Sequence, residues 1–173
     1  LSSAKVGLPE VKLGLLPGAG GTQRTPRLAG VQAALEIMTT GNPLNAKQAH
    51  AFHLIDEVVD DTAAEGDLSR AAVAFARRLL EQDVPLRRVR DMHIDPASAP
   101  HSLFEDFRNR LDRSARGQIA PHNIVSCVEA AVHLSMDQGL AKGRELFTEC
   151  LLSPQSAARR HLFFAEREAA KVK

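Results

Sequence analysis

The stretch spanning residues 7–24 constrains the fold most, because no single helix or strand can run through it. It holds two prolines and five of the chain's eleven glycines. Proline fixes the backbone angle φ and removes an N–H donor, whereas glycine adopts left-handed conformations freely. We therefore predict a short strand over residues 5–8 that Pro9 ends, a turn on Pro17 and the glycines after it, and a short helix over residues 23–28 closed by Gly30.

The rest of the chain predicts many helices and few strands. Apolar residues recur at helical spacing over four stretches, residues 31–39, 103–116, 119–134 and 138–152. Three more helices are predicted from their N-cap candidates, Asn45, Asp67 and Ser153. The helix after Asp67 is long and carries an apolar stripe of Leu68, Ala72, Phe75, Ala76 and Leu79. Residues 54–59 begin with Leu54-Ile55 and end in two valines, which predicts a second strand. Two short strands do not form a stable sheet alone, so either they pair with strands outside this chain or the first third is poorly ordered.

Composition excludes several classes of function. The formal net charge is +1 and neither Trp nor Tyr is present, so we expect no nucleic acid partner. No apolar run reaches the length of a membrane span, and no basic region followed by an apolar block marks a signal peptide. Cys127 and Cys150 do not form a CxxC pair and fall on apolar helix faces, which favours buried free thiols and a cytoplasmic location.

Glu10 is the first candidate for chemistry. It stands between a proline and an apolar stretch, and a carboxylate in apolar surroundings is a candidate general acid or base. The alternative is a solvated loop carboxylate, or a partner of Lys12, and spacing alone leaves the two interpretations open. His50, His53 and Glu57 have mixed ligand spacing, and we interpret them as solvated or packed side chains and predict no metal site.

The glycine-rich turn is the second candidate. Gly18 and Gly20 begin a G-x-G-x-x-G pattern, but Gln23 stands where the third glycine belongs and no P-loop Lys-Ser or Lys-Thr follows. A nucleotide-binding loop is therefore disfavoured. The turn either serves only to reverse the chain, or it offers backbone N–H groups at a helix start to an oxygen atom.

The run that carries both candidates is Gly7-Leu8-Pro9-Glu10-Val11-Lys12-Leu13-Gly14-Leu15-Leu16-Pro17-Gly18-Ala19-Gly20-Gly21-Thr22-Gln23-Arg24. It closely resembles the signature of the enoyl-CoA hydratase (crotonase) family. The second half, including Arg116-Gly117-Gln118-Ile119-Ala120-Pro121 and Ser153-Pro154-Gln155-Ser156, is similar to the linker region of multifunctional fatty-acid oxidation enzymes. In those proteins a hydratase/isomerase domain is followed by this linker and then by an NAD-dependent 3-hydroxyacyl-CoA dehydrogenase.

This resemblance implies a helix-dominated α/β fold, namely the C-terminal half of a crotonase-like ββα spiral followed by linker helices. It implies three parts: residues 1–59 as the back half of the crotonase core, residues 60–117 as the last helices of the hydratase domain, and residues 118–173 as linker helices. The implied partners are the N-terminal half of the hydratase domain and a dehydrogenase domain, both outside this chain.

The resemblance also implies roles for two residues. Glu10 matches the second of two catalytic glutamates, which delivers a proton to the α-carbon of a 2-enoyl-CoA, and Gly18 matches a glycine whose N–H holds the attacking water. The first glutamate and both oxyanion-hole donors lie outside this chain, so we expect the chain alone to be inactive. The substrate is an acyl-CoA thioester, no cofactor is expected in this chain, and NAD belongs to the dehydrogenase domain.

The sequence departs from the family at two positions. His53 stands where the family usually has glycine, and if that position is left-handed, histidine is strained there. Gly143 stands within a predicted helix where the family usually has glutamate. A competing hypothesis is a non-catalytic helical interaction module formed by residues 60–173. Strands missing from this chain should leave a large apolar patch uncovered, so we expect self-association.

Overall fold

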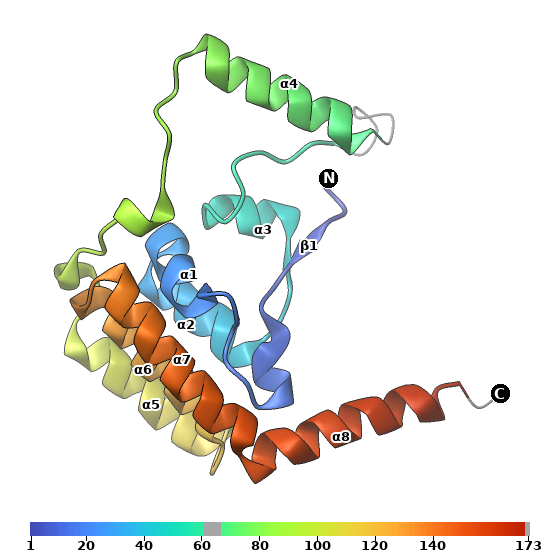
Figure 1. The fold of residues 1–173 in the computed structure, drawn as a ribbon, viewed down its shortest axis with the longest axis vertical. Coiled ribbons are helices and arrows are strands. Elements are labelled where there is room, and N and C mark those ends of the chain that lie inside the picture. Colours follow the sequence, from blue (N-terminus) through green and yellow to red (C-terminus); the bar gives the residue numbers. More distant parts are fainter. Residues whose placement is uncertain (61–66, 172–173) are drawn as a thin grey trace.

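The computed structural model describes residues 1–60 and 67–171, and helices dominate this part of the chain (Figure 1). Its elements follow in chain order: β1 (Lys5–Val6), η1 (Pro9–Leu13), α1 (Gly21–Ala29), α2 (Val31–Thr40), β2 (Leu44–Asn45), α3 (Ala46–Ala51), α4 (Leu68–Glu81), η2 (Val89–Asp91), η3 (Pro96–Ser98), α5 (His101–Ser114), α6 (Ile119–His133), α7 (Met136–Leu152) and α8 (Pro154–Ala169).

Helix ends follow the chemistry that the sequence predicts. Asn45 accepts a hydrogen bond from the N–H of Gln48, whose side chain accepts from the N–H of Asn45 in return, so α3 begins with a capping box. Asp67 caps α4 and Ser153 caps α8, as predicted. Gly41 ends α2 in a left-handed conformation.

The strands differ from the prediction. β1 pairs antiparallel with β2, joining Lys5 to Asn45 and Val6 to Leu44, and this partner within the chain was not predicted. The strand predicted over residues 54–59 is wrong, because this segment is irregular. Its residues make local and ionic contacts instead: the Leu54 N–H donates to the carbonyl of Ala49, and Asp56 pairs with Arg87 at 2.5 Å. Two adjacent β-branched residues, such as Val58 and Val59, form a strand only where a neighbouring strand hydrogen-bonds to them.

The core lies between two helix pairs that are far apart in sequence. α1 packs against α2, α6 and α7, α2 packs against α6, and α5 packs along α6 (Figure 1). The fully buried side chains at their meeting point include Leu35, Met38, Phe104, Ile124 and Val128. The stripes predicted for α5 and α6 are the faces that this core buries.

A buried polar network ties α1 to α6. The Gln23 side chain has no exposed surface, and its amide donates to the carbonyl of Cys127 at 2.8 Å. The Arg27 guanidinium donates to backbone carbonyls of Gln23, Ala131 and Leu134. Burial lowers the pKa of Arg27 from its ordinary value. Carbonyl oxygens thus satisfy a buried cation without a carboxylate.

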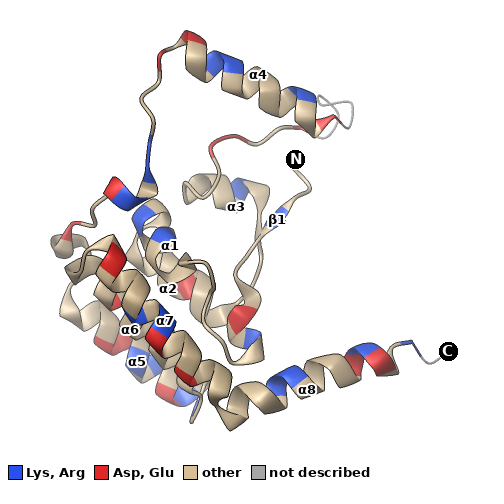
Figure 2. Cartoon of the chain, in the orientation of Figure 1, with Lys and Arg blue, Asp and Glu red and all other residues tan. Residues whose placement is uncertain are grey.

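Two helices stand away from this core. α4 lies apart from the bundle and has no buried residue, although its apolar stripe was predicted from the sequence (Figure 1). α8 runs outward from the end of α7, and Ser156 in its first turn is its one buried residue. Within the described ranges, no helix is both long and apolar enough to cross a bilayer. Charges of both signs are spread along the helices (Figure 2).

Candidate active site

Glu10 sits in the short 3-10 helix η1, which packs against two other elements, α2 and α8. Pro9 occupies its first turn, and Gly14 ends it at φ +68°. On one side, a Cβ at Gly41 would lie 2.9 Å from a Val11 methyl carbon, so the end of α2 approaches η1 closely. The buried Val11 thus anchors the segment that carries Glu10.

The first turn of α8 closes over the other end of η1. The Ser156 hydroxyl donates to the carbonyl of Leu13 at 3.0 Å, and Arg159 donates to the carbonyl of Lys12 at 3.2 Å. A Cβ at Gly14 would lie 3.2 Å from the Cα of Ser156. Sequence reasoning identified Ser153 and Pro154 as a helix start but missed this clamp, since nothing local shows which segment a helix start touches.

The Glu10 carboxylate is half-buried and only partly satisfied. One oxygen, Oε1, lies 3.4 Å from the backbone N–H of Gly18. The other, Oε2, is buried and has no hydrogen-bond partner among the described residues. A buried carboxylate oxygen without a donor is costly, and such groups gather where a ligand completes the site. The structure therefore brings the two sequence candidates together and excludes an ion pair between Glu10 and Lys12, whose ammonium donates to Asn42.

The glycine-rich turn places its N–H groups by a left-handed bend. Ala19 has φ +48° and Gly20 has φ +74°. At Gly20 a Cβ would clash with a side-chain carbon of Leu140 at 2.5 Å, so both conformation and space require glycine. Gly18 differs, because its φ lies outside the left-handed region and a Cβ there would meet nothing within 4 Å. Its missing side chain leaves the N–H accessible beside Glu10.

A hollow of about 540 Å³ opens between this turn and α7. We call it the turn-side hollow; its lining includes Gly18, Arg24, Leu140, Gly143 and Phe147. In the helix predicted over residues 138–152, Leu140 and Phe147 are half-buried. The residues of α7 that the core buries are Met136, Gly139, Leu146 and Cys150. The apolar stripe of α7 therefore serves both the core and a hollow that adjoins Gly18.

The other sequence candidates do not join this site. Within residues 1–60 and 67–171, no group of His, Cys, Asp and Glu side chains is arranged to hold a metal ion. His53 has φ +56°, so the position where the family usually has glycine is indeed left-handed. Cys127 and Cys150 are free and buried, as predicted. Burial raises the pKa of the Cys127 thiol to about 11, which keeps it protonated near neutral pH.

Comparison with known proteins decides the family. The family model for enoyl-CoA hydratase/isomerase matches residues 2–111, which is more than half of the chain. The chain belongs to the enoyl-CoA hydratase/isomerase family. Its fold is accordingly a helix-dominated, partial crotonase-like α/β fold, and the predictions of family and fold class are confirmed.

Relatives of this hydratase/isomerase family member are multifunctional enzymes. The peroxisomal bifunctional enzyme of Homo sapiens is 39% identical over 170 residues, 98% of this chain and 23% of that protein. The fatty acid oxidation complex subunit alpha of Aliivibrio fischeri is 37% identical over 179 residues, 99% of this chain and 24% of its own length. The chain thus spans about a quarter of these relatives.

A solved hydratase has a similar fold. The crystal structure of carnitinyl-CoA hydratase from Mycobacterium avium matches with a TM-score of 0.53 and 32% identity, over 96% of this chain and 50% of that one. The match therefore includes α6, α7 and most of α8 as well as the segment that carries Glu10 and Gly18.

Proposed function

We propose that this chain supplies one carboxylate and one water-holding N–H of a site that hydrates 2-enoyl-CoA thioesters. The observation that carries the proposal is the buried, unpartnered Oε2 of Glu10, with the Gly18 N–H at 3.4 Å from Oε1 of the same carboxylate. One water molecule between the Glu10 carboxylate and the Gly18 N–H would contact both of these groups. The family membership supports this chemistry over other uses of a poised carboxylate.

In the proposed reaction, water adds across the α,β double bond. A second carboxylate, upstream in a longer protein, takes a proton from the water as its oxygen attacks the β-carbon. Glu10 in its acid form delivers a proton to the α-carbon, and the Gly18 N–H holds the water oxygen. Two further N–H donors stabilise the charge on the thioester oxygen. Since loss of one such donor costs about 10²–10³ in rate, this chain without those groups is inactive.

The same carboxylates support a shift of a double bond between the 3 and 2 positions. A carboxylate that removes a proton from C2 and returns one to C4 moves the bond without net oxidation. The proposed parent protein also carries a dehydrogenase domain that uses NAD. In it, residues 1–59 and 60–117 belong to the hydratase domain, in line with the family match over residues 2–111, and residues 118–173 link the two domains.

The test joins this chain to the upstream half of a hydratase domain and measures hydration of crotonyl-CoA by the loss of enoyl thioester absorbance. Glu10→Gln keeps the shape of the side chain and removes its acid, so the rate falls by about 10²–10⁴-fold. Glu81→Gln, at the exposed end of α4, is the matched control and leaves the rate unchanged. An unchanged rate in Glu10→Gln shows that the assignment is wrong.

A second candidate function is the helical interaction module, which the exposed side of α4 favours. Leu68, Val73 and Leu80 on α4 are 48%, 51% and 81% exposed, and Leu86 beyond it is 87% exposed. An uncovered apolar face of this kind binds another protein surface or a second copy. Light scattering tests whether the face binds a second copy of the chain. We expect the unchanged chain to form oligomers, and we expect Leu80→Lys to weaken this association. Binding of a CoA thioester, measured by thermal shift, favours the hydratase site instead.

A further inference from the structure

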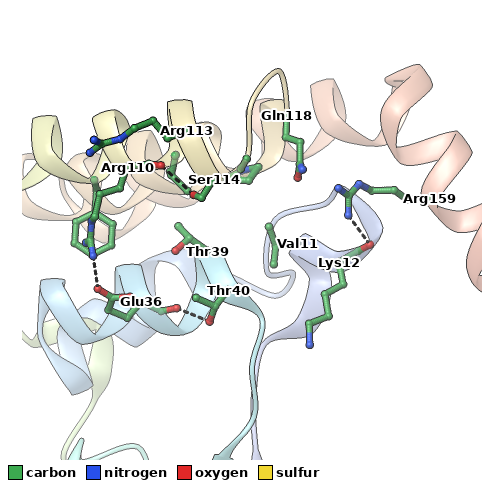
Figure 3. A pocket seen from close by; sticks show the side chains of 14 residues that line it. Val11, Lys12, Glu36, Thr39, Thr40, Arg110, Arg113, Ser114, Gln118 and Arg159 are labelled. Atoms are coloured by element: carbon green, nitrogen blue, oxygen red, sulfur yellow. Dashed lines mark hydrogen bonds and ion pairs between the residues drawn. The ribbon is translucent and has the colours of Figure 1, made fainter.

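The 3-10 helix that carries Glu10 receives hydrogen bonds at its C-terminal end from α8, which is distant in the chain. A helix end leaves its last carbonyl groups without partners in the helix itself. In η1 the carbonyls of Lys12 and Leu13 both accept from the first turns of α8. The Ser156 hydroxyl donates to Leu13, and the Arg159 guanidinium donates to Lys12, the bond drawn in Figure 3. α8 thus completes the C-terminal cap of η1.

The contact uses the one buried side chain of α8. Ser156 has no exposed surface, whereas the rest of α8 runs outward from the bundle (Figure 1). A Cβ at Gly14 would lie 3.2 Å from the Cα of Ser156, so the two backbones are in close contact. A buried hydroxyl costs free energy unless it is hydrogen-bonded, and this one bonds to the carbonyl of Leu13. The burial of α8 is therefore directed at η1.

One backbone hydrogen bond carries this contact on to Glu10. The N–H of Leu15, the residue after Gly14, donates to the carbonyl of Glu10 at 3.1 Å. At the side chain, Oε1 of Glu10 lies 3.4 Å from the Gly18 N–H, which is near the limit for an N–H···O hydrogen bond. A small displacement of the end of η1 is thus enough to change the distance between the proposed acid and the water-holding N–H.

From these contacts we propose that Ser156 is a positioning residue for the hydration reaction, because it holds η1 where the Glu10 carboxylate lies beside the Gly18 N–H. This inference rests on the proposed function of Glu10. Arg159 is half-buried and supplies the weaker part of the same clamp. The alternative is that both contacts only anchor α8 to the bundle. The two roles separate experimentally, because only the first changes the chemical step.

The kinetic test uses the joined hydratase domain described above and crotonyl-CoA. Ser156→Ala should lower kcat by about 10–10²-fold and leave KM unchanged, since a misplacement of about 1 Å costs up to about 10²-fold in rate. Arg159→Met should lower kcat less. Arg160→Met is the matched control: it removes the neighbouring arginine of α8, which donates to the carbonyl of Leu151 and not to η1, so kcat stays the same.

A double variant separates positioning from overall stability. In the Glu10→Gln background, Ser156→Ala should lower kcat no further, because no acid remains to be positioned. An equal further loss in that background would show that Ser156 acts only through the stability of the fold, and the proposal would be wrong.

Amide hydrogen exchange of the chain alone gives a readout that does not depend on activity. Ser156→Ala should speed exchange at the Leu15 N–H, which bonds to Glu10, more than at the Ala157 N–H, which bonds to Ser153 at the start of α8. Faster exchange at Ala157 alone assigns Ser156 to the anchoring of α8 and overturns the proposal.

The kinetic results also distinguish this inference from the function on which it rests. If Glu10→Gln slows hydration and Ser156→Ala does not, the proposed function stands and Ser156 is not a positioning residue. If Glu10→Gln leaves the rate unchanged, the proposed function and this inference are both wrong. Circular dichroism of each variant confirms that it is folded.

Discussion

Two glycines on one face of α7 predict opposite effects of the same substitution. Gly139 and Gly143 both lie inside the helix, where alanine is more favourable than glycine by about 0.5–1 kcal/mol. A Cβ at Gly143 would lie 3.4 Å from the Thr22 hydroxyl oxygen, an ordinary contact. Gly143→Ala therefore raises the free energy of unfolding by about 0.5–1 kcal/mol.

At Gly139 the same Cβ would lie 2.0 Å from Oε1 of Gln23 and 2.6 Å from its Cδ. Gln23 is fully buried and cannot move into solvent. Either α7 moves away from α1, which costs about 1–3 kcal/mol as overpacking, or Gln23 loses its 2.8 Å bond to Cys127, which costs about 1–3 kcal/mol. After the helix gain, Gly139→Ala lowers the free energy of unfolding by about 0.5–2 kcal/mol.

Urea unfolding followed by far-ultraviolet circular dichroism measures both variants. Fluorescence is not suitable, because the chain has neither Trp nor Tyr. The slope of the transition should stay the same, so that the midpoints report stability alone. Repeating each titration at two protein concentrations separates folding from self-association. If Gly139→Ala is as stabilising as Gly143→Ala, then α7 does not approach α1 as the structure shows.

Two smaller predictions concern backbone strain and a buried thiol. His53→Gly relieves the strain of a left-handed histidine, about 1–2 kcal/mol, and adds about 0.4–1 kcal/mol of unfolded-chain entropy cost, so urea unfolding should show a net gain of up to about 1.6 kcal/mol. A loss of stability would mean that the His53 side chain makes contacts worth more than the strain. Burial raises the pKa of the Cys127 thiol from its ordinary value of 9.0 to about 11 in the folded state. The buried, protonated thiol therefore contributes its full stabilisation below pH 9.0, and this contribution is lost as the pH rises toward 11. Over that range the wild type should lose about 2–3 kcal/mol more than Cys127→Ala, and parallel pH profiles would contradict the burial of the thiol.

Local signals in the sequence predict most of the helices, because caps and apolar spacing act within one or two turns. Two pairs of residues predict the residue at which a helix begins, namely Asn45 with Gln48 for α3 and Ser153 with Pro154 for α8. The strand expected at residues 54–59 failed because a strand needs a partner that no local pattern reveals. The apolar stripe over residues 68–79 correctly predicted a helix, α4. It did not predict that the stripe is left without burial, since burial depends on which other elements pack against the helix.

Glu10 and Gly18 were both found from the sequence, since a carboxylate and a glycine turn are chemical signals that a short motif carries. Their mutual distance of 3.4 Å was not, because it depends on the path of the chain between them, which includes the left-handed Gly14. The unpartnered oxygen of Glu10 also required the structure, because it depends on every side chain that surrounds the carboxylate.

The position of Glu10 depends on residues almost a whole chain length away. Ser156 has no exposed surface, and its hydroxyl bonds to the carbonyl of Leu13, three residues after Glu10. Its Cα also fills the space that a side chain at Gly14 would need. Since Gly14 ends η1, the first turn of α8 contacts the end of the 3-10 helix that carries Glu10. α8 therefore holds in place, through Ser156, the segment that carries the proposed acid.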